Sequence, residues 1–124
     1  MSKYHSRKIT LDGETFDSQK EYRRWRALRL LERAGQIKDL KRQVKYELIP
    51  PQYETVERYS QKTGKRLKDG ERFLEHGCYY VADFVYSRPD GSVVVEDSKG
   101  VRTDAYIIKR KLMLHVHGIK ILET

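Results

Sequence analysis

Two aspartates and a lysine lie on either side of a short turn in this chain. Asp83 precedes the turn, and Asp97 and Lys99 follow it. The residues between them, "RPDGS" at 88–92, predict a three-residue hairpin loop in which Gly91 takes the left-handed conformation. That loop places Asp83 directly opposite Asp97, with Lys99 two residues further along the same strand and so on the same face.

Two like charges directly opposite each other destabilise a sheet unless something lies between them. A divalent cation would remove the repulsion, and all-oxygen ligation suits Mg²⁺ or Mn²⁺. Such an ion polarises a phosphoryl oxygen and lowers the pKa of a bound water, while the Lys99 ammonium would hold that water or stabilise developing charge. The competing interpretation is a surface ion pair between Asp97 and Lys99. Strand parity turns Glu96 to the opposite face, which favours Asp97 as the ligand.

The elements that must position these residues can be read from periodicity and capping. Ser18 and Glu21 form a capping box at the start of a helix over Gln19 to Ala34, which Gly35 ends. Its apolar positions are Tyr22, Trp25, Leu28, Leu30 and Leu31, and its other face carries Arg23, Arg24, Arg26 and Arg33.

Alternating patterns predict a hairpin at 9–16 and strands over Ile37 to Ile49, Cys78 to Ser87 and Val93 to Lys99. Thr103 caps a second helix over Asp104 to His117, and a short strand follows at Ile119 to Leu122. The order helix, three strands, helix, strand predicts an α/β fold, with a small mixed sheet flanked by helices. Met1 to Lys8 is interpreted as a basic tail.

Residues 53–75 show little apolar patterning and contain Lys62, Lys65, Arg66 and Lys68. A structureless loop of that length is unusual in a small domain. We therefore expect a basic hairpin or arm that projects from the domain.

The whole chain, 1–124, has the length of a single domain. It carries 26 Lys and Arg against 18 Asp and Glu, a formal net charge of +8, which favours a polyanionic partner such as nucleic acid. No stretch is long and apolar enough for a membrane span, and the single cysteine excludes an internal disulfide framework. We expect a cytoplasmic protein without membrane association.

The stretch from Asp83 to "DSK" at 97–99 resembles the bipartite signature of the PD-(D/E)XK nuclease superfamily. The order of elements is that superfamily's αβββαβ core, the restriction-endonuclease-like fold, and Glu21 occupies the place of its acidic residue on the first helix. The stretches "FDSQKEYRRW", "YVADFVY" and "VVVEDSKGVRTDAY" are similar to a group of small phage and prophage proteins near Holliday-junction resolvases. The departures are Ala82 in place of a proline and an aspartate, Asp97, as the second acidic residue.

The resemblance implies a Mg²⁺-dependent DNA endonuclease that cleaves branched DNA or Holliday junctions in phage recombination or replication. Asp83, Asp97 and Glu21 would ligate the metal, and Lys99 would position the attacking water. A homodimer in the cytoplasm of a bacterial host is a further implication, and no small-molecule cofactor is expected. The alternatives are a non-catalytic nucleic-acid-binding module with the same fold and a sequence-specific nicking or restriction enzyme.

Basic residues outside the site are candidates for contacts with phosphates, which hold DNA without reading its sequence. Arg110 shares a stripe of the second helix with Tyr106, and its alternative role is ordinary partial burial. The full set expected to bind nucleic acid is Arg23, Arg24, Lys62, Lys65, Arg66, Lys68 and Arg110.

Overall fold

The computed structural model describes residues 8–11, 13–98 and 101–124. A four-stranded sheet forms the centre of the compact part of the molecule, which we call the body. Its strand order is β3-β6-β7-β8, with β7 and β8 parallel and the other neighbours antiparallel. The strands are β3 (Lys38–Ile49), β6 (Cys78–Ser87), β7 (Val93–Asp97) and β8 (Leu122–Glu123). The predicted small mixed sheet is confirmed.

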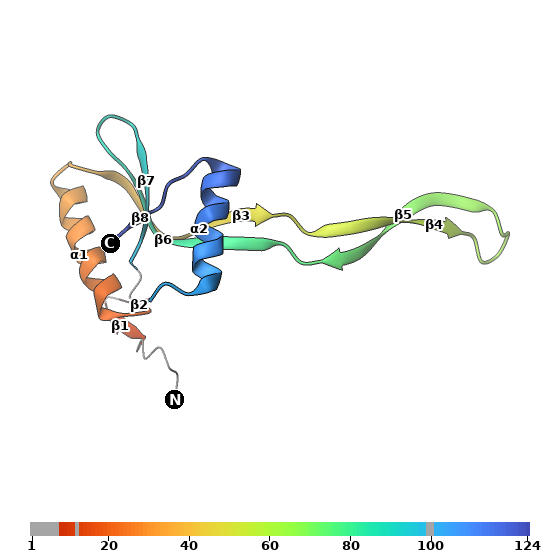
Figure 1. The fold of residues 1–124 in the computed structure, drawn as a ribbon, viewed down its shortest axis with the longest axis horizontal. Coiled ribbons are helices and arrows are strands. Elements are labelled where there is room, and N and C mark those ends of the chain that lie inside the picture. Colours follow the sequence, from red (N-terminus) through yellow and green to blue (C-terminus); the bar gives the residue numbers. More distant parts are fainter. Residues whose placement is uncertain (1–7, 12, 99–100) are drawn as a thin grey trace.

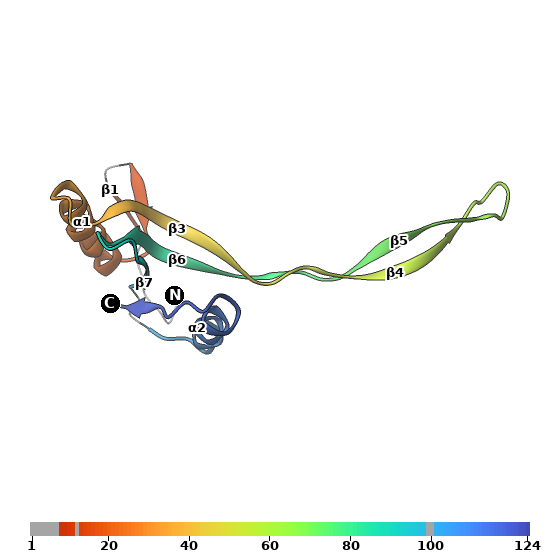
Figure 2. The same ribbon diagram turned by 90° about the horizontal axis from the view of Figure 1, so that it is seen from above.

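Helix α1 (Gln19–Arg33) and helix α2 (Asp104–His117) lie on opposite sides of this sheet (Figures 1 and 2). Both predicted N-caps are present, since Ser18 Oγ accepts from the Glu21 amide at 3.2 Å and Thr103 Oγ1 from the Tyr106 amide at 3.1 Å. Neither helix, nor any other in the described ranges, is long and apolar enough to cross a membrane. The α/β architecture is therefore confirmed.

Each helix covers its own cluster of buried side chains. Leu28 of α1 packs with Ile37, Phe84, Tyr86 and Val94. On the α2 side the buried cluster consists of Leu48, Tyr80, Ala82, Val95, Tyr106, Met113 and Ile121. Two clusters on opposite faces make the central strands β6 and β7 the most buried part of the sheet.

Each helix buries a somewhat different face from the one that its apolar residues predict. Leu30 was expected on the buried face of α1 but is 63% exposed, and Arg24 turns toward the sheet instead. On α2, Ile108, Leu114 and Val116 are exposed. A narrow sheet covers only one stripe of each helix, so part of each broad apolar face stays in water.

The turn between β6 and β7 has the predicted glycine-bulge geometry. Gly91 has a φ of 89°, and the Arg88 amide donates to the Ser92 carbonyl at 2.8 Å. The ladder then pairs Ser87 with Val93 and continues to Phe84 with Glu96. This is the register that the turn chemistry predicted.

A smaller hairpin precedes α1, as expected for residues 9–16. Strands β1 (Ile9–Leu11) and β2 (Glu14–Phe16) pair antiparallel, and Phe16 is fully buried. The turn residue Asp12 and the predicted tail, except Lys8, lie outside the described residues.

Strands β4 (Gln52–Tyr59) and β5 (Arg66–Glu75) form a two-stranded ribbon that projects far from the body (Figures 1 and 2). Its ladder continues that of β3 and β6 past Pro50 and Pro51. Gly77 permits this junction, because a Cβ there would lie 2.9 Å from the carbonyl oxygen of Ile49. We call residues 52–75 the arm.

The basic character of the arm is confined to its tip. Along the ribbon Arg72 pairs with Glu54, and Arg66 pairs with Asp69 at 2.9 Å, whereas Lys62, Lys65 and Lys68 are exposed around the end loop. The ribbon also carries large apolar side chains between 40% and 54% exposed. They are Tyr53, Tyr59, Leu67, Phe73 and Leu74.

Strand β3 contains two left-handed residues that the alternating pattern does not reveal. Asp39 has a φ of 57° and Gln43 a φ of 54°, and a register shift against β6 lies between Lys38 and Lys41. Left-handed backbone is uncommon for residues other than glycine and is often found near functional sites. Gln43 lies at the site described next.

Candidate active site

The β6–β7 ladder brings Asp83 and Asp97 to the same end of the sheet. The paired residues end at Phe84 and Glu96, and Asp83 and Asp97 are the next residues of the two strands. Both are buried, with exposed fractions of 7% for Asp83 and 0% for Asp97. Asp83 Oδ2 accepts a hydrogen bond from the Ser98 amide at 2.8 Å, which fixes its carboxylate at the end of β7.

Tyr80, two residues before Ala82 on β6, binds the carboxylate of Asp97. Its hydroxyl donates to Asp97 Oδ2 at 2.6 Å. Burial raises the pKa of Tyr80 well above its usual value, and the hydrogen bond to Asp97 raises it further. The phenol therefore remains protonated at neutral pH and acts as a donor to this carboxylate.

Glu21 enters the site from the first turn of α1 and is 2% exposed. Its Oε2 accepts from the Asp17 amide at 3.3 Å, one residue before the position that a capping box would use. Burial raises the pKa of Glu21, and the neighbouring negative charge of Asp83 raises it further. This coupling places Glu21 and Asp83 in one electrostatic cluster.

Two neighbours on β3 contact the other oxygen of Glu21. Arg42 donates to Oε1 at 3.1 Å and Gln43 at 3.2 Å. The Arg42 guanidinium also lies 3.9 Å from the centroid of the Phe16 ring. Sequence reasoning missed both residues. The available signal was Arg42 itself, a charged residue at the parity of the apolar positions Leu40 and Val44.

Lys99, the predicted water-positioning residue, lies outside the described residues. Within the described ranges, no three His, Cys, Asp or Glu side chains are already arranged as a metal-ion ligand set. Mg²⁺ does not require one, because it usually keeps several waters and binds proteins through one or two carboxylates. Asp83 and Asp97 form such an all-oxygen pair, so the donor set fits a hard cation.

Glu96 belongs to a separate, structural network. It is fully buried, and Arg24 of α1 donates to Oε1 at 2.7 Å and to Oε2 at 2.9 Å. The Tyr86 hydroxyl also donates to Oε2. Burial, with this hydrogen bond, raises the pKa of Tyr86 to about 12. Arg24 was expected to contact DNA, but its guanidinium is committed to Glu96, so we assign it to folding.

The remaining predicted phosphate contacts do not lie on the two strands that carry Asp83 and Asp97. Arg23 is exposed on α1, where it donates to Gln19 Oε1 at 3.4 Å. Arg110 of α2 is 3.4 Å from Glu123 Oε1, and the Tyr106 hydroxyl donates to Glu123 Oε2 at 2.9 Å. Tyr106 is buried, and Arg110 is half-buried. The four basic residues near the arm tip are far from the body along the ribbon (Figure 1).

Comparison with known proteins identifies a family and no characterised relative. A family model described as "Protein of unknown function (DUF1064)" matches residues 1–121. No curated protein and no solved structure matches the chain.

Proposed function

Because the chain belongs to the DUF1064 family, whose function is unknown, we propose a function from its own residues: a metal-dependent DNA endonuclease. The observation that carries this proposal is the buried end of the β6–β7 ladder, where Asp83 and Asp97 are the residues that follow the last pair, Phe84 and Glu96. Glu21 adds a third carboxylate, close enough for the charge of Asp83 to raise its pKa. Arg42 pairs with Glu21 at 3.1 Å, and the further buried negative charge of Asp83 and Asp97 would be stabilised by a bound cation.

Asp83 and Asp97 would hold Mg²⁺ or Mn²⁺ together with water and a substrate phosphate. The bound ion would supply a water of lowered pKa and a polarised phosphoryl oxygen. Tyr80 and the Ser98 amide keep the two aspartates in place, and Arg42 and Gln43 keep Glu21 turned inward. Lys99 would orient the water that adds to phosphorus as the bond to the leaving oxygen breaks, with a proton passing to that oxygen.

The substrate and setting are part of the same proposal. A branched DNA, such as a fork or a four-way junction, fits a protein that offers basic residues on α1 and also at the arm tip. The setting is phage or prophage recombination or replication in the bacterial cytoplasm, with a homodimer acting on a symmetric junction.

The direct test measures melting temperature with Mg²⁺, Mn²⁺ or a chelator, and cleavage of linear duplex, single strand, fork and four-way junction. We expect the cation to raise the melting temperature of the wild type but not of Asp83→Asn or Asp97→Asn. Asparagine keeps the acceptor that the Ser98 amide or Tyr80 uses, so these variants should fold. Asp69→Asn, which removes an exposed aspartate of the arm, is the matched control. Equal responses in all four proteins would refute the metal site.

A non-catalytic nucleic-acid-binding module is the second candidate. The observation that favours it is that the chain's own donors already bind Glu21, Asp83 and Asp97. Binding of branched DNA that is unaffected by Asp83→Asn, without cleavage under any metal, would support this candidate over the endonuclease.

A further inference from the structure

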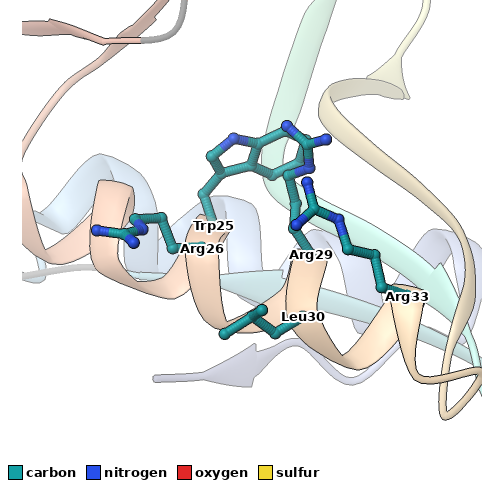
Figure 3. Close-up of a pocket in the computed structure, with 5 residues that line it drawn as sticks. All are labelled: Trp25, Arg26, Arg29, Leu30 and Arg33. Carbon is teal, nitrogen blue, oxygen red and sulfur yellow. The ribbon is translucent and has the colours of Figure 1, made fainter.

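One side of α1 carries a cleft that the proposed function does not use, and its Trp25 also packs against the buried cluster of Leu28 and Phe84. The volume of the cleft is about 200 Å³. The residues that line it are Trp25, Arg26, Arg29, Leu30 and Arg33. Figure 3 shows Arg29 and Arg33 reaching toward the indole of Trp25, while Arg26 points along the helix away from them. The cleft thus combines an aromatic wall with cationic rims.

The three arginines have no carboxylate partner within the described part of the chain. None of the ion pairs among residues 8–11, 13–98 and 101–124 involves Arg26, Arg29 or Arg33. Like charges three and four residues apart on a helix repel each other and weaken it. An anionic partner lying along α1 would remove this repulsion, and the positions on successive turns match a chain of phosphates better than a single ion.

The apolar residues of the cleft help to decide between a single-stranded and a double-stranded nucleic acid as its ligand. Leu30 is 63% exposed beside it, and the Arg29 guanidinium lies 5.6 Å from the centroid of the Trp25 ring. A duplex presents phosphates but keeps its base faces stacked inside. A single strand presents phosphates together with unstacked bases, which pack on aromatic and guanidinium groups.

We propose that this cleft binds an unpaired nucleotide of a single-stranded polynucleotide. Arg29 and Arg33 contact its phosphates, and the base packs against Leu30 and the Trp25–Arg29 pair. This inference rests on the proposed function and deepens it. Helix α1 carries Glu21 at one end and the cleft further along, so a strand released at a branch point can follow the helix away from the carboxylates. Selectivity for branched DNA would then come from recognition of its unpaired strand.

The chain provides its own reporter, because Trp25 is its only tryptophan. With a chelator present, we would titrate the protein with a single-stranded DNA of about 16 nucleotides, its RNA equivalent and a duplex of equal length. We expect Trp25 fluorescence to be quenched by the single strand and to change little with the duplex. RNA distinguishes the source of the strand, and quenching by RNA alone would overturn the assignment to DNA.

The salt dependence of binding reports how many phosphates the protein neutralises. For a single strand, removing one such arginine–phosphate interaction lowers the slope of log K against log salt by about 0.7. Arg29→Gln with Arg33→Gln should lower the slope accordingly, and Leu30→Ser should weaken single-strand binding about threefold or more without changing the slope. Lys111→Gln, which removes an exposed cation from α2 on the other side of the sheet, is the matched control. Equal slopes in the double variant and the control would overturn the proposal.

This test and that of the proposed function can fail separately. Cleavage of DNA without any effect of single strands on Trp25 fluorescence would refute the nucleotide-binding cleft and support the endonuclease. Quenching with the expected slopes, but no cleavage under any metal, would support the cleft and refute the endonuclease. A Trp25 change that depends on protein concentration and needs no nucleic acid would assign the cleft to a protein occupant and overturn the inference.

Discussion

Two adjacent acidic residues, Glu96 and Asp97, have opposite roles because strand geometry sends them to different neighbours. Glu96 meets a guanidinium and a phenol and is neutralised within the fold. Asp97 accepts a hydrogen bond from Tyr80 and lies one residue beyond the last pair of the ladder, next to the end of β6 that carries Asp83. A buried charge paired by the chain is a structural element, whereas we propose a cation as the further partner of Asp83 and Asp97.

The Arg24–Glu96 pair should be essential for folding. Arg24→Met would leave Glu96 buried without its cation, and we expect a loss of about 3 kcal/mol, near the lower end for buried pairs because Arg24 is 31% exposed. Urea denaturation measures this loss. Arg23→Met, one position away and exposed, should change stability by no more than about 0.5 kcal/mol. A recovery in Arg24→Met with Glu96→Met would show that the uncompensated charge is the cause.

Glu21 should make stability depend on pH. Its pKa in the fold is raised above the ordinary 4.5, mainly by burial and then by Asp83, so the folded state holds its proton more tightly than the unfolded state. That contribution is complete below the ordinary pKa and is lost as pH rises through the raised value.

Relative to the wild type, Glu21→Gln should therefore gain stability as pH increases from about 4 toward about 7 in the presence of a chelator. Denaturant midpoints at each pH give the difference, and Glu75→Gln on the arm provides the baseline. Saturating Mg²⁺ should reduce the gain, since the cation compensates the same charges. A difference that stays constant with pH would contradict the coupling to Asp83.

At the scale of the residue, the sequence reveals a partner only where local geometry determines it. The β6–β7 register as far as Phe84 and Glu96 could be predicted, because "PDG" favours the glycine-bulge turn and that turn fixes the register. The bonds of Glu21 to Arg42 and Gln43 could not be predicted, since they join a helix to a strand whose local conformation is irregular.

At the scale of the elements, β3 shows which features of a strand the periodicity of its sequence can predict. Its extent was predicted from alternation, but its left-handed residues were not, because side-chain type determines φ only weakly in residues other than glycine. Helix faces were predicted less well than strand faces. The contacts of α1 and α2 depend on the width of the sheet, which no single segment encodes.

The two left-handed residues of β3 offer a matched comparison. Asp39→Gly should stabilise the protein by about 1 kcal/mol, because glycine adopts a positive φ without steric cost. Gln43→Gly relieves the same strain but loses the hydrogen bond to Glu21, so its gain should be smaller. Thermal or urea unfolding of both variants measures the difference. Equal gains would show that the Gln43 amide contributes nothing to the position of Glu21.

At the scale of the whole molecule, the arm and the body should be separable. Residues 53–75 were expected to project because they lack the apolar alternation of a strand that faces a core, and the ribbon does so (Figure 2). Replacing 52–75 with a short glycine-serine turn should leave the melting temperature within a few degrees of the wild type, since both buried clusters lie in the body.

The same deletion should weaken DNA binding and reduce its salt slope, because Lys62, Lys65, Arg66 and Lys68 near the tip are removed. Alanine at these four positions in the full-length arm is the control that separates lost charge from lost length. Unchanged affinity after both alterations would exclude the tip from the DNA interface. A body that unfolds on deletion would instead show that the ribbon takes part in its stability.

The continuous ladder has a consequence for changes in chain length. The pairing of Arg42 with Phe84 and of Val44 with Ala82 is kept only because the two legs of the ribbon, from the end loop back to the body, contain compensating numbers of residues. An insertion shared equally by both legs lengthens the arm and leaves the carboxylates where they are. An insertion in one leg alone shifts the pairing by one residue, which turns every following side chain to the other face unless a bulge absorbs it. The irregularities at Gln52–Tyr53 and Glu47–Ile49 lie between the tip and the site, where they can take up such a shift. A matched insertion would therefore change the reach of the arm and leave the pairing of the body strands unchanged.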